Sequence, residues 1–249
     1  MDNTLAPLNF KVTVITVVKN ADKVIERLFN SVRNFKNEQV EFIVLDGVST
    51  DNTVELIKQN EDIIDTWLSE PDAGIYDAMN KAVKLACGQW LIFLGADDEL
   101  LEGFKQIIPL LKDGNTIYYG NVFFHHAHIT GKIKDNYTLT KTNICHQAIF
   151  YPKNVFKKYS YQTQYVQCAD YVLNLNLWDD RDFKFVYYDY LIANFPEGGF
   201  STHTRDLLFE HDRTQLFKKH LTRFAYYHYI YKKYKKAGIL EVLKQMLSN

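Results

Sequence analysis

The sequence predicts an α/β fold with a central, mixed but mostly parallel sheet flanked by helices. Within the first hundred residues, a strand-like run is followed by a helix-like run three times. The run at residues 90–94 is apolar throughout, as in a strand buried on both faces of such a sheet. Because 47% of the residues are hydrophobic and 24% are charged, the chain can form a substantial core.

The elements before that central strand follow from local patterns. Residues 11–18 are rich in β-branched side chains and predict a first strand, and residues 40–45 predict a second. Between them, apolar side chains recur at helical spacing. Polar residues at 49–53 then start another helix, and residues 63–68 predict a short third strand.

Residues 69–99 organise the rest of the chain. The apolar spacing from Ile75 predicts a helix that Gly88 ends, and Asp-Asp-Glu at residues 97–99 comes just after the buried strand. Adjacent carboxylates repel one another and are costly to bury alone, so a divalent cation with phosphate oxygens would suit them. An acidic turn that faces water is the alternative.

Acids also follow the earlier strands. Asp46 ends the second strand, and Asp72 lies in the loop before the helix at Ile75. Because successive parallel strands end at one edge of a sheet, we expect these acids to meet Asp97 and Asp98 in one crevice. The sequence has no GxGxxG after the first strand and no GxxxxGK[ST], which argues against a dinucleotide-dependent dehydrogenase and a P-loop nucleotidase.

Charge and composition limit which binding partners and which cellular compartment we expect. The net charge of −1 argues against a general nucleic-acid binder, but residues 201–249 carry ten Lys and Arg against four Asp and Glu. This basic end favours an anionic partner. Neither a signal peptide nor a transmembrane run is evident, and three widely spaced cysteines indicate reduced thiols. We therefore expect a cytoplasmic protein.

Three stretches carry the signature of a family: VTVITVVKNADKVIERLFNSV, EFIVLDGVSTDNTVELI and SEPDAGIYDAMNKAVKLACGQWLIFLGADDEL. They resemble family 2 glycosyltransferases of the GT-A fold, especially the small bacterial enzymes that build O-antigen, colanic-acid and capsule units. The resemblance continues through ICHQAIFYP and spans residues 10–200. It implies an inverting transfer from a nucleotide-diphosphate sugar, with UDP expected, to a glycan or a polyprenyl-diphosphate-linked acceptor.

The resemblance also implies roles for residues on the donor side. Asp46 would hold the nucleotide base, Asp72 would contact the nucleoside, and Asp98 would ligate Mg²⁺ or Mn²⁺ at the diphosphate. Lys19 and Asn121 depart from the family pattern, in which an aromatic neighbour of the base and an acid, respectively, often stand at these positions. The residues implied for donor binding are Thr16, Val17, Asp46, Asp72, Gly74 and Asp97.

The resemblance places the catalytic carboxylate on Asp170. Glycosyl transfer needs a general base within hydrogen-bond reach of the acceptor hydroxyl. An acid at the start of a helix is also simply a favourable charge there, and this alternative stays open. His146 and Gln147 would contact the acceptor or a donor phosphate, with a structural histidine as the alternative.

The end of the chain has two further features. The paired glycines in residues 197–205 would let His203 or Arg205 close over the diphosphate, although a plain linker explains them equally well. The run YYHYIYKKYKK is aromatic and basic, so its helix would lie on the anionic inner face of the cytoplasmic membrane or pack on the body of the protein.

These features divide the chain into a catalytic domain and a tail. We expect a GT-A catalytic domain at residues 1–204, with a nucleotide-sugar half near 10–100 and an acceptor half near 101–204, and a basic, aromatic helical segment at 205–249. Two other functions stay open, a sugar-nucleotide-binding module without transferase activity and a nucleotidyltransferase of similar fold. The second needs a Gly-rich, Arg-containing loop after the first strand, and TVVKNADK lacks one.

Overall fold

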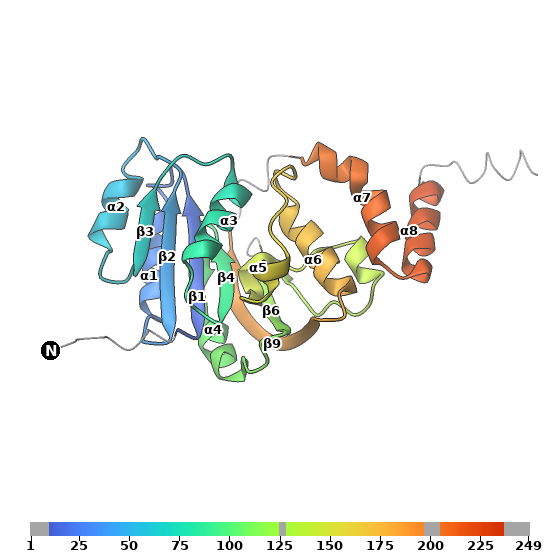
Figure 1. Cartoon of the computed structure of the whole chain (residues 1–249), viewed down its shortest axis with the longest axis horizontal. Helices are drawn as coiled ribbons and strands as arrows, with labels where there is room; N and C mark the ends of the chain where they lie inside the picture. The colour runs from blue at the N-terminus through green and yellow to red at the C-terminus, as the bar shows by residue number, and fades with distance from the viewer. Residues whose placement is uncertain (1–9, 125–127, 197–204, 237–249) are drawn as a thin grey trace, which may run out of the picture.

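The computed structural model describes residues 10–124, 128–196 and 205–236. In these residues, helices cover both faces of one curled sheet (Figure 1). The strands are β1 (Val12–Val18), β2 (Val40–Asp46), β3 (Thr66–Ser69), β4 (Trp90–Leu94), β5 (Glu99–Leu100), β6 (Thr116–Phe124), β7 (His128–Ile129), β8 (Ile149–Pro152) and β9 (Lys184–Phe195). The helices are α1 (Ile25–Arg33), α2 (Thr53–Gln59), α3 (Ile75–Leu85), α4 (Glu102–Ile107), α5 (Val155–Lys158), α6 (Ala169–Asp179), α7 (Leu207–His220) and α8 (Arg223–Lys236). Short 3₁₀ turns are η1 (Ile108–Leu110), η2 (Thr138–Thr140) and η3 (His146–Ala148).

The strand order is β3-β2-β1-β4-β8-β6-β9-β5, with β7 beside β6. In the first half of the sheet, β1 pairs in parallel with β2 and β4, and β2 pairs in parallel with β3. In the second half, β8 runs antiparallel to both β4 and β6, while β6 and β9 are parallel. The predicted α/β fold with a mixed, mostly parallel sheet is confirmed.

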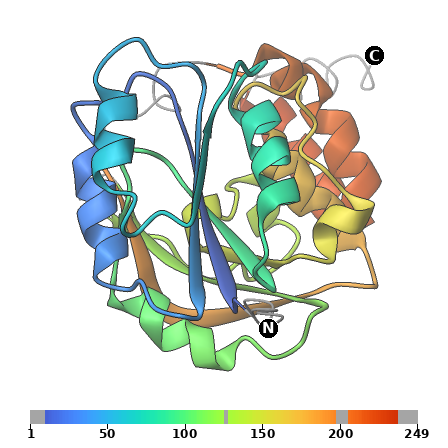
Figure 2. The ribbon, with the colours of Figure 1, turned by 60° about the vertical axis from the view of Figure 1, so that its left-hand side comes forward.

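The core consists of one apolar cluster on each face of the sheet. Successive side chains of a strand point to opposite faces, and β1 therefore contributes Val12 and Val14 to one cluster and Ile15 to the other. The first cluster contains side chains of α1, α2 and α4, and the second contains those of α3, α6 and α7. Figure 2 shows α3 on the same side of the sheet as the carboxy-terminal helices. These two clusters bring α3 and α6 together, although about 90 residues of chain separate them.

Two local predictions need correction. The strand predicted at residues 63–68 begins only at Thr66, because Ile63 and Ile64 are buried in a turn and not paired in the sheet. An apolar side chain can be buried without lying in a strand. Helix α3 ends at Leu85 instead of at Gly88. Gly88 is instead needed for close packing, since a Cβ there would lie 2.5 Å from Thr13 Oγ1 on β1.

Helix α7 packs against α6, and α8 packs against α7 and η2 and also exposes aromatic side chains. Phe209, Phe217 and Ala225 are buried in the second cluster. On another face of α8, Phe224 is 78% exposed and Tyr227 is 65% exposed. Within the described residues, no helix has the length and apolar character that crossing a bilayer requires.

Candidate active site

The carboxyl ends of β1, β2 and β3 meet at Asp46. The sheet register places Val18 and Ser69 on either side of this residue. Asp46 is fully buried, and its Oδ2 accepts hydrogen bonds from Ser69 Oγ at 2.6 Å and from the Ser49 amide at 3.0 Å. Its Oδ1 accepts from the Ser49 hydroxyl. The Asp46 carboxylate therefore holds the loop after β2 against the end of β3.

The loop before α3 approaches the same strand end. Asp72 Oδ1 accepts the amide of Gly74 at 2.8 Å, and Gly74 has a φ of 123°, which favours glycine. A Cβ on Gly47 would collide with Asp72 Oδ2 and would lie 3.4 Å from Lys19 Cδ. Asp72, Gly47 and Lys19 are thus neighbours at the end of β2. This contact brings the loop before α3 against the loop after β2.

The other two donor-side candidates, Thr16 and Val17, lie on β1, the strand that pairs with β2. Thr16 is fully buried, and its hydroxyl has no hydrogen-bond partner among the described residues. Val17 is partly exposed beside Leu45 of β2. A short distance away, Val48 has a φ of 60°, an uncommon conformation for a β-branched residue. Backbone strain of this kind clusters at ligand-binding sites, so it marks the loop after β2 as part of the candidate site.

Asp98 occupies the loop after β4 and is fully buried. Its Oδ2 accepts the Gly95 amide at 2.6 Å, whereas its Oδ1 has no hydrogen-bond partner among the described residues. Burial, followed by the charge of Asp97, raises the pKa of Asp98 to about 7, although the Gly95 amide, His146 and Gln147 lower it in part. A buried carboxylate oxygen without a donor is a group that a cation would satisfy.

The neighbouring Asp97 is partly exposed, and the Arg27 guanidinium donates to its backbone carbonyl. The described residues contain no group of three or more His, Cys, Asp or Glu side chains that would bind a metal ion. The predicted acids are therefore spread along the sheet edge and do not form a closed metal cage. Mg²⁺ commonly binds to one or two carboxylates together with substrate phosphates, and Asp98 fits that open arrangement.

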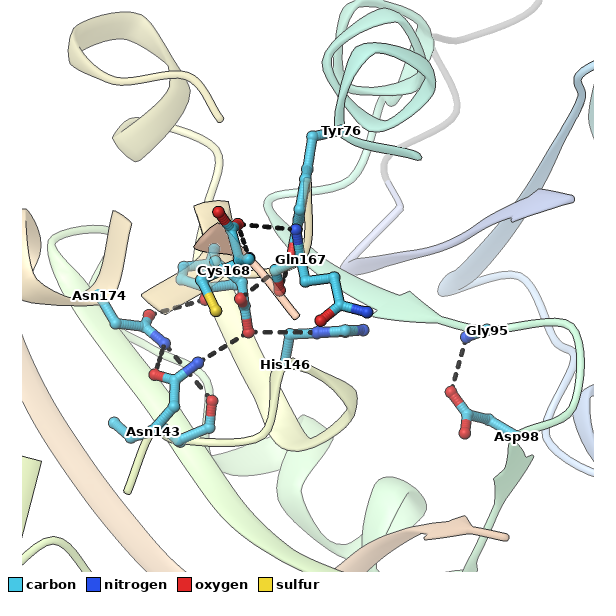
Figure 3. A network of polar contacts seen from close by, with 12 residues as sticks. Tyr76, Gly95, Asp98, Asn143, His146, Gln167, Cys168 and Asn174 are labelled. Atoms are coloured by element: carbon cyan, nitrogen blue, oxygen red, sulfur yellow. Dashed lines mark hydrogen bonds and ion pairs between the residues drawn. The ribbon is translucent and has the colours of Figure 1, made fainter. Parts of the chain in front are cut away.

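Asp170 lies in the first turn of α6, and three side chains from other parts of the chain hold its carboxylate (Figure 3). Tyr76 of α3 donates its hydroxyl at 3.0 Å to Oδ1, and Asn143 donates its amide at 2.7 Å to Oδ2. His146 Nδ1 lies 3.4 Å from Oδ2. The Asp170 side chain is 11% exposed. It is thus oriented by neighbours and still open on one side.

His146 is close to both carboxylates of the site, since its Nδ1 lies 3.4 Å from Asp170 Oδ2 and the charge of Asp98 also acts on it. Burial lowers the pKa of His146, but the hydrogen bond and charge of Asp170, with the charge of Asp98, outweigh it and leave the pKa above its ordinary value. The next residue, Gln147, is buried beside Asp98. The fold therefore brings together His146, Gln147, Asp98 and Asp170.

Residues 13–168, more than half of the chain, match the family model described as glycosyl transferase family 2. The chain belongs to this family. It is 29% identical over 197 residues to a PGL/p-HBAD biosynthesis glycosyltransferase of Mycobacterium bovis (strain BCG / Pasteur 1173P2), which covers 75% of this chain and 77% of that relative. The prediction that the protein is a glycosyltransferase is confirmed.

Solved structures share the fold of this family 2 glycosyltransferase. S. aureus TarS 1–349 in complex with UDP has a TM-score of 0.63 at 16% identity, over 84% of this chain and 64% of that one. A mannosyltransferase from Pyrobaculum calidifontis in complex with GDP-Man and Mn²⁺ has a TM-score of 0.60 at 16% identity, over 85% of this chain and 63% of that one. The chain spans less than two thirds of both structures. The likeness confirms the predicted GT-A fold.

Sequence reasoning missed two side chains that contact the candidate base of this glycosyltransferase. Tyr76 lies inside the GIYDA signature, and its place in that motif was the one available signal for it. Asn143 stands in a loop without any pattern. Of the two predicted lid residues, His203 lies outside the described residues, and Arg205 is exposed at the start of the last described segment.

Proposed function

We propose that this glycosyltransferase transfers a sugar, with inversion, from a nucleotide-diphosphate donor to a hydroxyl of a lipid-linked surface glycan, and that it requires Mg²⁺ or Mn²⁺. The proposal rests on one observation. The Asp170 carboxylate is held by Tyr76 and Asn143, and His146 contacts it while the charge of Asp98 also acts on this histidine. A base for the acceptor and a group for the diphosphate thus both lie near one histidine.

Asp170 acts as the general base in this reaction. The acceptor hydroxyl gives its proton to a carboxylate oxygen of Asp170 while the acceptor oxygen attacks the anomeric carbon. The bond from that carbon to the diphosphate breaks, and the nucleoside diphosphate leaves with the electron pair. Because attack and departure occur on opposite faces of the sugar, the configuration inverts in a single step. His146 lies beside both reacting sides and orients Asp170 through Nδ1.

Asp98 is the residue that would hold the cation, through the oxygen that has no donor within the described residues. When bound, a divalent cation stabilises the negative charge of the departing diphosphate as a Lewis acid. Asp97, beside it and partly exposed, would face the ribose or the shell of that cation. The Pyrobaculum calidifontis mannosyltransferase of similar fold was solved in complex with Mn²⁺, which supports such a requirement.

The nucleoside is proposed to bind at the ends of β1 and β2. Asp72, held beside Gly47 by the turn at Gly74, is placed to contact the nucleoside. Because both oxygens of Asp46 are bonded to serines, this residue is proposed to act on the base by shaping the loop after β2. Thr16 and Val17 would line the same site. We propose UDP as the carrier, since TarS was solved in complex with UDP and with UDP-GlcNAc.

The acceptor is proposed to be presented at a membrane surface. Four aromatic side chains at intervals of three and four residues are exposed along α8: Phe224, Tyr227, Tyr231 and Tyr234. Lysines lie between and after them, a combination that suits the interface of an anionic bilayer. Peripheral binding to the inner face of the cytoplasmic membrane would follow. Flotation with phosphatidylglycerol vesicles tests this, and equal flotation of Phe224→Ser/Tyr231→Ser would contradict it.

The substitution Asp170→Asn tests the reaction itself. Removing a positioned general base should lower transfer by roughly 10²- to 10⁴-fold. Nucleotide affinity should stay unchanged, because the proposed nucleoside site does not include Asp170. Transfer is measured as UDP release from a panel of UDP-sugars with a polyprenyl-diphosphate-linked sugar as acceptor, and UDP affinity by calorimetry with Mn²⁺. Turnover like that of the wild type would remove Asp170 from the mechanism.

A further inference from the structure

A basic groove lies away from the proposed site, where η2, α7 and α8 meet. It has a volume of about 530 Å³, and its lining residues are Tyr137, Thr140, Lys141, Arg213, Tyr229, Lys232 and Lys233. Four of these seven are cations, and no carboxylate lines the groove among the described residues. Such a concentration of positive charge is unfavourable without an anion between the cations.

The walls of this basic groove are tied to one another. The His228 ring of α8 stacks on Tyr137 at a centroid distance of 4.1 Å, and Asn136 accepts the Thr222 amide at 3.2 Å. Lys233 Nζ donates to Thr214 Oγ1 of α7 at 3.0 Å. The elements that form the groove are therefore held in place before any ligand arrives, and only lining side chains would need to move.

Two polar atoms in the basic groove lack a partner. Arg213 Nε and Tyr229 Oη are buried from solvent, and neither makes a hydrogen bond to any described residue. The nearest acid, Glu210, takes only Arg213 Nη1, at 3.0 Å. Buried donors without acceptors cost free energy, so each calls for an acceptor from outside the chain.

The basic groove adjoins the acceptor side of the site through one short segment. Tyr137 and Lys141 flank η2, whose Leu139 carbonyl accepts the hydroxyl of Tyr171, the residue after Asp170. Two residues beyond Lys141, Asn143 donates to Asp170 itself. An anion bound here would therefore be held by the same segment that orients the candidate base.

We propose that the basic groove binds the diphosphate of a lipid-linked acceptor and thereby positions its sugar at Asp170; this rests on the proposed use of such an acceptor. Four cations match a group with several negative charges better than a single carboxylate. Once the exposed Lys232 and Lys233 side chains shift, the Arg213 Nε–H and the Tyr229 hydroxyl, which the free protein buries from solvent, supply directional donors to phosphate oxygens. The nucleotide donor does not need this groove, since its proposed residues lie at the ends of β1, β2 and β4.

Calorimetric titration with inorganic pyrophosphate, in the presence of a chelator, measures the basic groove by itself. The variant Lys141→Gln/Arg213→Gln should bind pyrophosphate at least about tenfold more weakly than the wild type, because two charged hydrogen-bond donors are removed. The matched control is Lys218→Gln/Lys219→Gln, which removes two exposed charges of α7 outside the groove. Equal weakening in the control, or no binding to the wild type, would overturn the proposal.

The variant Tyr229→Phe tests the unpartnered hydroxyl. It should weaken pyrophosphate binding about threefold and leave the melting temperature unchanged or slightly higher, since the buried hydroxyl bonds to none of the described residues. A lower melting temperature with unchanged affinity would show a structural hydroxyl and contradict the proposal.

Vesicles identify the source of the phosphate. Phosphatidylcholine vesicles that contain a polyprenyl diphosphate should bind the wild type and release the groove variant. If that variant lost only its binding to phosphatidylglycerol vesicles, the groove would be a general charged surface and the proposal would fail. Titration with UDP and Mn²⁺ should give the same affinity for the wild type and the groove variant. Failure of UDP to bind either protein would count against the proposed donor alone.

Discussion

The two halves of the sheet hold their candidate acids in different ways. In the donor half, Asp46 is bonded to Ser49 and Ser69, which are 3 and 23 residues away, and Asp98 is bonded to Gly95 three residues before it. In the acceptor half, the partners of Asp170 are 24 to 94 residues away. The hydrogen bonds of Asp46 thus come from the ends of neighbouring strands, and Gln147 reaches Asp98 from a distant segment, whereas the candidate base depends on how α3 packs against α6.

After Asp170→Asn, the largest expected effect is in the donor half, from Asp98→Asn. Loss of the carboxylate that would hold the cation should lower transfer by roughly 10²- to 10³-fold, as for other electrostatic groups at a departing charge. The melting temperature should hold or rise, because the fully buried charge is replaced by a neutral amide. UDP release measures the loss of transfer, and thermal denaturation measures the melting temperature.

The control for Asp98→Asn is Glu102→Gln, at an exposed acid on α4, which should alter neither the rate of transfer nor the melting temperature. If Asp98→Asn retained metal-stimulated transfer, the charge of the Asp98 carboxylate would not be needed for the cation.

A smaller effect is expected in the acceptor half from Asn143→Ala. The change removes the 2.7 Å hydrogen bond to Asp170, so kcat should fall about tenfold while the KM for the donor stays unchanged. In an Asp170→Asn background the same change should have no further effect on transfer, because the two residues act as one unit. The kinetic constants of the wild type, the two single variants and the double variant measure this coupling. Additive losses would separate Asn143 from the candidate base.

The substitution Ser69→Ala tests how self-contained the Asp46 cluster is. It removes one donor from a buried carboxylate and should cost about 1–3 kcal/mol in the free energy of unfolding. It should also raise the KM for the donor with kcat unchanged, because the loop after β2 loses an anchor. Urea denaturation and steady-state kinetics measure the two effects.

The matched control for Ser69→Ala is Ser31→Ala on α1, whose hydroxyl is bonded to Leu28 and Leu100. This variant should lose stability without a change in the KM for the donor. A similar rise in KM for both variants would mean that the effect spreads through the fold.

The smallest expected effect comes from Asp180→Asn, at the opposite end of α6 from Asp170. A hydrogen bond from Lys158 holds the pKa of Asp180 at about 2, below its ordinary value of 3.8 and despite desolvation. A depressed carboxyl pKa stabilises the fold above the unfolded pKa, and this stabilisation is lost as the pH falls from about 4 towards 2.

Because the Lys158 side chain is half exposed, we expect Asp180→Asn to cost only about 1 kcal/mol at pH 7. Urea denaturation of both proteins across this pH range should show a difference that disappears near pH 2, with transfer at neutral pH unaffected. A difference that persisted near pH 2 would mean that the Lys158 contact does not depend on the charge of Asp180.

Sequence-based predictions were correct where they depended on residues close together in the chain, and they missed contacts between distant segments. The alternation of strands and helices and the acids at the ends of β2 and β4 were correct, because each depends on residues a few positions apart. The third strand begins three residues later than predicted, since burial of Ile63 and Ile64 does not require them to pair in the sheet. Tyr76 had only its place in the GIYDA motif as a signal, and Asn143 carried no local sign of its contact with Asp170.

The sequence alone determined which segments become strands and helices and which acids follow β2 and β4. Side-chain periodicity and turn chemistry act over a few residues and can be recognised without a structure. The tertiary structure alone decided that Asp46 would be bound by two serines, that Asp98 would keep one oxygen without a donor among the described residues, and that His146 would lie near both Asp98 and Asp170. Each of these depends on how distant segments pack against one another, and no short stretch of the chain specifies such packing.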